Sequence, residues 1–448
     1  SSTLQSTAAL THYASEKGGA DFTPTDLTDT AAAQSAAPTV TVRYAGGSLD
    51  PTDSSAAHTG GSNLVIGERM LYDIVVTLPE GGTQNLRLSD LIPDGFALDT
   101  SFGIDGYQLI TQLAASGSLT ADFAGAVTVA SVSGSGANGA DLVLSFSASN
   151  ALANNNAADN SFVIRVGLIA TNVTGNQAGR TLTNNASLTY SDPDGDTPNG
   201  ATPVDRNVAA TGGLPSATVV EPTLSVSHTA VTTGSPVGVD RGDEITYTIT
   251  VGNGTASTDV DAFDVRLSDV LPTELSGAQI VGVTLYGGAT LTGGDFVIQN
   301  GVLQLTDGAK LDIPKGATLV LQFKGVLNET TGTSGKVDNL VTVQWSSLDG
   351  ANSGERTGAD GELGSGALND YRVTSLHSED VAASGTISHV GGLPDTAGGT
   401  PSTADPQDVA VGEIVHYRVA LLVPLTGNAA ELGQGMLDAA QLAMFDLG

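Results

Sequence analysis

The sequence predicts an all-β protein built from tandem antiparallel β-sandwich repeats, and two patterns support this prediction. The first is strict alternation of apolar and polar residues, as in 39–44, 161–166 and 245–251. Residues two apart on a strand share one face, so this alternation is typical of sheets with one buried side. Clusters of Gly, Asn, Asp, Ser and Pro separate these runs at short intervals, and no convincing helical period occurs before residue 421.

The second pattern is a set of three anchor motifs that recur in the same order along the chain. The first anchor is Gly, then an acidic residue, with Tyr five positions after the Gly. The second is Leu-Ser-Asp-x-x-Pro, and the third runs from an Asn to an aromatic residue six positions later. The copies are 67–72, 242–247 and 412–417 for the first anchor, 88–93 and 267–272 for the second, and 184–190 and 339–345 for the third.

These spacings divide the chain into two complete sandwich repeats, 38–220 and 221–385. Residues 1–37 are predicted to hold the closing strand of a preceding repeat and a linker. Residues 386–448 are predicted to start a third repeat with an atypical tail, and the apolar spacing after Asn428 predicts a short helix there. The tyrosines of the first anchor are in phase with apolar neighbours, so we expect them in the cores. Arg241-Gly242-Asp243 spells an integrin-type tripeptide, but the anchor explains its position as strand entry.

The composition excludes several classes of function. With 48 acidic and 16 basic residues, the formal net charge is -32, which argues against nucleic acid as a partner. The absence of cysteine excludes disulfides, thiolate zinc sites and iron–sulfur clusters. No apolar run approaches the roughly 20 residues of a membrane-spanning helix. Six scattered histidines give no Ser–His–Asp arrangement, so we expect neither catalysis nor a small-molecule substrate.

Acidic loops are the candidate metal sites. Carboxylates at alternate positions can surround a hard cation, and Ca²⁺ takes 6–8 oxygen ligands. A loop of this kind follows the closing strand of each repeat, and either a calcium site or a solvated acidic turn accounts for it. The candidate ligands are Asp192, Asp194 and Asp196 in the first repeat and Asp349, Asp360 and Glu362 in the second.

A covalent Lys–Asn cross-link inside a sandwich needs a lysine, an Asn or Asp and a helping carboxyl group. The first repeat has no lysine, because none occurs between Lys17 and Lys310. The second repeat contains four lysines, and we do not expect a cross-link there either.

The anchors resemble a conserved-repeat family of bacterial and archaeal surface proteins, catalogued as domain of unknown function 11. Its strands read G-D-x-[IV]-x-Y and D-x-[LI]-P, as in Gly242 to Tyr247 and Asp269 to Pro272. The resemblance implies Ig-like sandwich modules, tandem arrays, an extracellular location and no conserved catalytic residues. The first repeat departs from the pattern, because Pro79 to Gly82 stands where an Asn is expected. Residues 419–448 are similar to the start of periplasmic type-I binding proteins of the penicillin-binding protein activator kind, over too short a stretch to imply a ligand cleft.

Together these observations predict a non-enzymatic structural module of a long exported bacterial surface protein, acting as a stalk, surface-layer or filament subunit. We expect self-association or contact with neighbouring repeats, with strand addition by residues near 5–15 as one route. The alternative is an adhesin that binds a glycan or host protein through its sandwich loops.

Overall fold

The computed structural model describes residues 3–23, 25–34, 36–45, 62–110, 123, 126–147, 149–151, 160–193, 195, 202–233, 239, 241–328, 336–359, 370–380, 385–392 and 415–421. These residues form mainly antiparallel sheets joined by turns, with one parallel pair (β16 with β4) and a short 3₁₀ turn, η3 (Gly293–Asp295), which confirms the predicted all-β class. The predicted C-terminal helix falls outside the described residues. No helix in the described part of the chain is long and apolar enough to cross a membrane.

The chain divides into two units with an unexpected distribution of segments. Unit 1 contains Ser1–Thr223, Thr255–Asp264 and Trp345–Tyr371, and unit 2 contains Leu224–Gly254, Val265–Gln344 and Arg372–Gly448. The change of unit after Thr223 lies close to the predicted boundary at 220/221. The inclusion of the two later segments in unit 1 was not predicted from the sequence.

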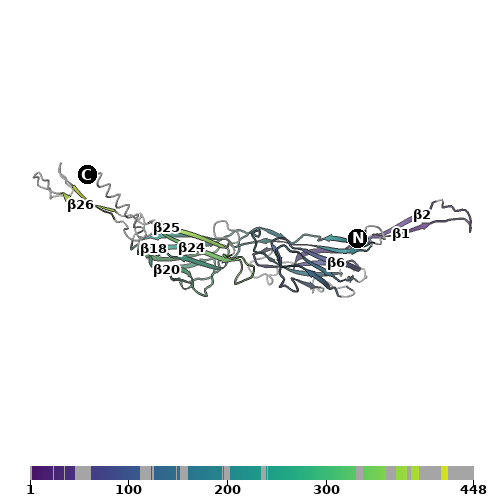
Figure 1. The fold of residues 1–448 in the computed structure, drawn as a ribbon, viewed down its shortest axis with the longest axis horizontal. Helices are drawn as coiled ribbons and strands as arrows, with labels where there is room; N and C mark the ends of the chain where they lie inside the picture. Colours follow the sequence, from purple (N-terminus) through teal and green to yellow (C-terminus); the bar gives the residue numbers. More distant parts are fainter. Residues whose placement is uncertain are drawn as a thin grey trace. The chain divides into compact units, whose positions relative to one another are not determined.

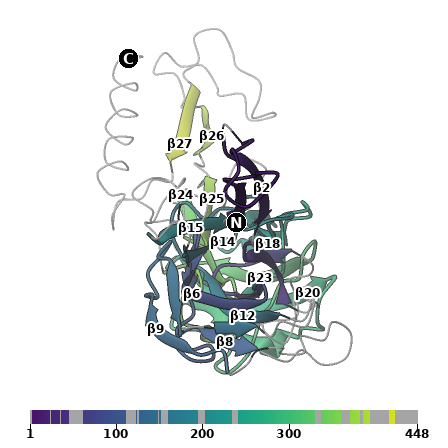
Figure 2. The same cartoon turned by 90° about the vertical axis from the view of Figure 1, so that its right-hand side faces the viewer.

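Unit 1 contains a sandwich of two main sheets. One has the strand order β15-β14-β6-β10-β9, with β11 also paired to β6, and the other has the order β3-β5-β12-β7, with β8 beside β12 (Figure 2). The bounds in the first sheet are β6 (Gly81–Leu91), β9 (Val129–Ser133), β10 (Leu142–Phe146), β11 (Ser149–Ala151), β14 (Asn185–Asp192) and β15 (Val204–Ala209). Those in the second are β3 (Thr39–Tyr44), β5 (Arg69–Thr77), β7 (Phe96–Leu98), β8 (Tyr107–Ile110) and β12 (Ser161–Ala170). A small third sheet joins β13 (Thr181–Thr183), β16 (Ser216–Val219) and β4 (Asn63–Leu64).

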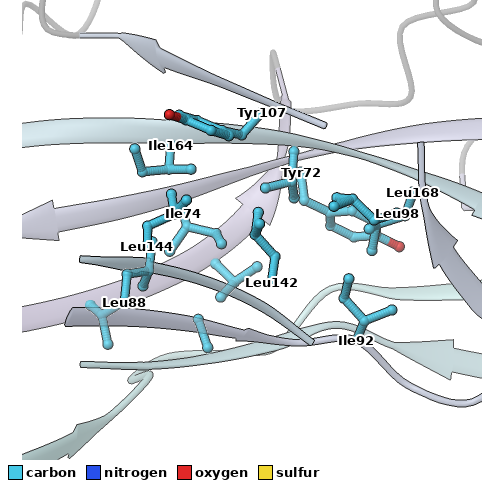
Figure 3. Close-up of a cluster of buried hydrophobic side chains, with 14 of the residues drawn as sticks. Tyr72, Ile74, Leu88, Ile92, Leu98, Tyr107, Leu142, Leu144, Ile164 and Leu168 are labelled. Atoms are coloured by element: carbon cyan, nitrogen blue, oxygen red, sulfur yellow. The ribbon is translucent and has the colours of Figure 1, made fainter. Parts of the chain in front are cut away.

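The core of unit 1 lies between the two main sheets. Figure 3 shows Tyr72, Ile74 and Ile164 from one sheet facing Leu88 and side chains of β10 from the other. Tyr72 is fully buried, as predicted, and its ring makes an edge contact with Phe96 at a centroid distance of 6.0 Å. Each buried Leu, Ile or Val contributes about 1.5–3 kcal/mol relative to exposure, so alternating side chains supply the stability of this unit.

Unit 2 repeats this architecture with a separate core. Its sheets have the orders β17-β18-β23-β20 and β21-β22-β19-β24-β25. The bounds are β17 (Leu224–Thr232), β18 (Glu244–Asn253), β19 (Phe263–Val270), β20 (Leu275–Tyr286), β21 (Phe296–Gln299), β22 (Val302–Leu305), β23 (Thr318–Leu327), β24 (Lys336–Ser346) and β25 (Arg372–Asp380). Tyr247 is fully buried and stacks on Phe323 with ring centroids 5.1 Å apart. The tyrosine in the second copy of the first anchor therefore lies in the core, as predicted.

Two further strand pairs form two-stranded sheets of their own. β26 (Gly385–Gly392) pairs with β27 (Val415–Leu421), in the stretch predicted to begin a third repeat, and the Tyr417 side chain lies outside the described part of the structure. β1 (Thr3–Leu10) pairs with β2 (Leu27–Gln34) in the antiparallel hairpin labelled in Figure 1. The strand predicted near 5–15 is present as β1, whose backbone pairs with β2 within its own chain, and strand addition to a neighbour stays a prediction.

Candidate functional site

The second and third anchors bring a carboxyl group and an amide together in the core of unit 1. Asp90 on β6 and Asn184, just before β14, are both fully buried, and Asp90 is in register with Ala186. Burial raises the pKa of Asp90 to about 7, and the neighbouring Asn184 amide offsets only part of that increase. The Asp90 side chain therefore keeps its proton to a much higher pH than an exposed aspartate does.

Unit 2 contains the same pair, with a histidine added. The Asn339 amide nitrogen donates to Asp269 Oδ2 at 3.3 Å and lies 3.3 Å from His228 Nε2. Since an amide nitrogen only donates, His228 Nε2 acts as the acceptor and the imidazole is neutral. Burial lowers the pKa of His228 to about 4, helped by His377, and burial raises the pKa of Asp269 to about 7.

Burial raises the pKa of the anchor carboxyl group in both cores, and two described lysines of the second repeat are held by other carboxylates. The lysines nearest in sequence are engaged elsewhere: Lys324 Nζ lies 2.9 Å from Glu244 Oε2, and Lys336 Nζ lies 2.6 Å from Asp380 Oδ1. The first repeat contains no lysine, so its sequence alone excludes a lysine-based cross-link there. In unit 2 the anchor Asn339 and Asp269 are hydrogen-bonded to each other in the core, whereas in unit 1 the buried Asp90 and Asn184 side chains lie near each other without a hydrogen bond of normal geometry.

A second buried polar cluster, which we call the Arg356 clamp, lies in unit 1. It consists of Arg356, Glu221, Tyr371 and Asn172 together with the Val173 carbonyl. Arg356 is fully buried and ion-pairs with Glu221. Its Nε donates to Asn172 Oδ1 at 2.9 Å, and its Nη2 donates to the Val173 carbonyl at 3.1 Å. The Tyr371 hydroxyl donates to Glu221 Oε1 at 2.9 Å, so both charges of the clamp are compensated.

Backbone and apolar contacts extend the clamp into the rest of segment 345–371. The Ser347 hydroxyl donates to the Ile66 carbonyl at 2.8 Å and accepts from the Arg356 backbone N–H at 2.9 Å. Leu348 joins a small buried cluster with Val65, Val220 and Val260. The two later segments of unit 1, Thr255–Asp264 and Trp345–Tyr371, therefore share one packed region with residues before Thr223.

Of the predicted metal ligands, the structure describes Asp192 and Asp349, one from each of the two acidic loops. Asp192 is buried, and its carboxylate ion-pairs with Arg206 at 3.1 Å. Asp349 lies in a turn where its carbonyl accepts from the Asn352 amide at 2.9 Å. Asp194, Asp196, Asp360 and Glu362 fall outside the described residues. Within the described ranges, no group of three His, Asp or Glu side chains is placed to hold a metal ion.

Sequence reasoning missed the Arg356 clamp. Its signal was present, because Arg356 is the only basic residue in segment 345–371 of a chain with few basic residues. A lone cation in an acidic loop favours an ion pair, but nothing in the pattern shows that its partner is Glu221.

No protein-family model matches the chain, and no curated protein sequence matches it. Among solved structures, the chain is similar to the C-terminal domain of the Streptococcus agalactiae AgI/II polypeptide BspA, with a TM-score of 0.33, 11% identity, and coverage of 71% of this chain and 97% of that chain. It is also similar to the 35 kDa C-terminal fragment of the S. agalactiae major pilin GBS80, with a TM-score of 0.24, 10% identity, and coverage of 77% and 91%. The full-length major pilin SpaD of Corynebacterium diphtheriae gives a TM-score of 0.26, 14% identity, and coverage of 69% and 60%. At these TM-scores the likenesses carry no argument about function.

Proposed function

We propose that this chain is a non-enzymatic structural module of a bacterial surface protein, which acts as part of a stalk, surface layer or filament and associates with further copies or neighbouring repeats. The observation that carries the proposal is the repetition of one sandwich plan with the same buried anchors. Tyr72 with Asp90 and Tyr247 with Asp269 occupy matching places in two separate cores. Such duplication lengthens a protein by adding modules that each bury their own apolar surface.

The Arg356 clamp supports a load-bearing role for unit 1. It compensates every charge that it buries and joins chain segments up to 184 positions apart by side-chain hydrogen bonds. Contacts between distant segments must break together when the unit opens, which favours cooperative resistance to unfolding. The resemblance to the conserved-repeat surface family, stated above for the anchor motifs, supports the same role and an extracellular location.

The net charge of -32 supports a place on a crowded surface, since like charge keeps modules soluble and separated. We propose that Ca²⁺ offsets part of this charge at the acidic loops of 192–196 and 349–362. Melting curves of the chain with Ca²⁺ and with a chelator test this, and Mg²⁺ serves as the control cation. A Ca²⁺-specific rise in Tm is expected, and identical curves would end the calcium proposal.

The surface function is tested on cells of the source organism. Antibodies raised against residues 38–385 are expected to label intact cells. Electron microscopy of the labelled cells is expected to show extended structures on their surface. Labelling only after permeabilisation would contradict the proposal. A matched antibody against a cytoplasmic protein reports whether the cells are intact.

A further inference from the structure

The described part of the chain contains three Asn-Gly dipeptides, at 138–139, 253–254 and 300–301. A glycine after an asparagine matters chemically, because no Cβ obstructs the approach of its backbone nitrogen to the asparagine side chain. That nitrogen can attack the side-chain carbonyl carbon, Cγ, and close a succinimide ring. The fold decides whether it does so, since the side chain must be free to turn towards the glycine and the glycine N–H must be free to react.

The first dipeptide is held at both reacting groups. The Gly139 N–H, which would have to attack, donates to the Phe96 carbonyl at 2.7 Å. The Asn138 amide nitrogen donates to the Asp94 carboxylate, and Asn138 Oδ1 accepts from the Gly95 N–H at 2.8 Å. Ring closure at Asn138 would break all of these hydrogen bonds, so the native fold suppresses it.

The second dipeptide is protected by burial. Asn253 ends β18 and is only 7% exposed. Its amide nitrogen donates to the Ile313 carbonyl at 2.8 Å, and its backbone N–H donates to the Ala317 carbonyl at 3.0 Å. The amide that would have to leave as ammonia is therefore enclosed and bonded in the folded chain.

The third dipeptide has neither protection. Asn300 and Gly301 form the two-residue turn between β21 and β22, and their φ angles of 52° and 76° are those of a type I′ turn. Both residues are exposed, and a Cβ added to Gly301 would meet no atom within 4 Å. Across the described residues, neither the Asn300 amide nor the Gly301 N–H has a hydrogen-bond partner.

We propose that Asn300 is a site of spontaneous deamidation in the folded protein, with water as the co-reactant. The Gly301 nitrogen forms a bond to Asn300 Cγ while the bond from Cγ to Nδ2 breaks, and ammonia leaves with the proton that the Gly301 nitrogen gives up. Water then opens the succinimide ring. Opening at the side-chain carbonyl gives aspartate, and opening at the backbone carbonyl gives isoaspartate.

The two products have different consequences for unit 2. Either product adds one negative charge to the turn, whereas isoaspartate also adds a methylene group to the backbone. The length of a hairpin loop sets its turn type and strand register, so a lengthened turn disturbs the pairing of β21 with β22. These strands supply the buried Phe296 and Leu303, and the Gly301 carbonyl accepts from the Leu271 N–H at 2.9 Å. We therefore expect the isoaspartate form to be less stable than the unreacted chain.

Peptide mapping by mass spectrometry tests the proposal on the intact chain, incubated folded at neutral pH for several weeks and digested afterwards. The peptide that contains Asn300 is expected to gain the mass difference between an amide and a carboxylic acid roughly tenfold faster, or more, than the peptides with Asn138 and Asn253. Both aspartate and isoaspartate should appear at position 300. The other two asparagines are internal controls, because the same glycine follows each of them.

A second sample is digested first and incubated afterwards, so that the fold no longer protects any dipeptide. All three asparagines should then react at similar rates, which assigns their difference in the folded chain to the structure. Asn300→Gln keeps an amide but requires a larger ring that closes slowly, so its peptide should stay unchanged. Equal rates for the three sites in the folded chain, or aspartate at 300 without isoaspartate, would overturn the proposal. The proposed surface function does not depend on this reaction and stands or falls separately.

Discussion

The buried guanidinium of Arg356 ion-pairs with Glu221, which precedes it by 135 positions in the chain. The same carboxyl group accepts from the Tyr371 hydroxyl, and its second oxygen accepts from the Ala178 N–H. Burial raises the pKa of Tyr371 well above its usual value, and the adjacent Glu221 carboxylate adds to that shift. The phenol therefore stays protonated and keeps donating to Glu221 at neutral pH.

Arg356→Ala is expected to destabilise unit 1 by about 3–5 kcal/mol, because it leaves the Glu221 carboxylate buried without its counter-charge. Denaturant unfolding followed by Trp345 fluorescence measures this, since the single tryptophan stacks on Tyr371 beside the clamp. Lys336→Ala is the matched control, because its ion pair with Asp380 is exposed to solvent and is expected to stabilise the chain little. Equal losses for the two variants would contradict the assignment of the clamp.

Truncation tests whether unit 1 needs its late segments. A fragment of residues 1–223 lacks segment 345–371, so Val65 and Val220 lose their contact with Leu348, and Glu221 loses its charge partner. We expect the fragment to melt well below the chain of residues 1–385, or to fail to fold, as measured by circular dichroism. A fragment as stable as unit 1 within the longer chain would show that residues 1–223 are sufficient.

Strand alternation and the anchors made the two sandwiches predictable, because strand faces are set by neighbouring residues. Tyr72 and Tyr247 are in phase with buried side chains, so their positions followed from local pattern alone. The Asp and Asn of the later anchors were visible as repeated residues, but their pairing was not predicted. Asp90 and Asn184 lie 94 positions apart, and only the sheet register brings them together.

The acidic loops show a different limit. Asp192 has a metal-ligand spacing in the sequence, and the structure adds a partner that this spacing did not show, Arg206 across the β14–β15 hairpin. The spacing of residues along the chain shows which carboxylates are close in sequence. The register between paired strands decides which basic side chain lies opposite them. The membership of segment 345–371 in unit 1 was hidden for the same reason, since no local pattern shows where a long loop packs.

Asp90→Asn tests the proton held in the core of unit 1. The folded pKa of Asp90 is about 7 and its ordinary value is 3.8, so the folded state binds this proton more tightly. Its contribution to stability is complete below pH 3.8 and is lost as pH rises through 7. The variant mimics the protonated side chain, so it should match the natural chain near pH 4 and be more stable by a few kcal/mol at pH 8. Trp345-monitored unfolding at both pH values checks this, and a variant less stable at pH 8 would contradict it.

His228→Val tests the role of the histidine that unit 2 adds to its buried pair. Valine is chosen because Val42 occupies the equivalent position in unit 1: Val42 is paired with Ile74, as His228 is paired with Ile249. The folded pKa of His228, about 4, lies below its ordinary 6.5, so its contribution is present above pH 6.5 and is lost as pH falls through 4. Asp269, with a folded pKa of about 7, has the opposite dependence, and the two largely cancel between pH 4 and 6.5.

The natural unit 2 should therefore show little change in stability across this range. In His228→Val only the Asp269 dependence remains, so stability should fall steadily as pH rises from 4 to 7. Calorimetry at several pH values measures how the free energy of unfolding changes with pH. This slope is independent of any pH-independent loss of stability caused by the smaller side chain. The double variant His228→Val, Asp269→Asn is the control and should restore a flat profile, whereas a slope unchanged by His228→Val would show that the imidazole does not take part.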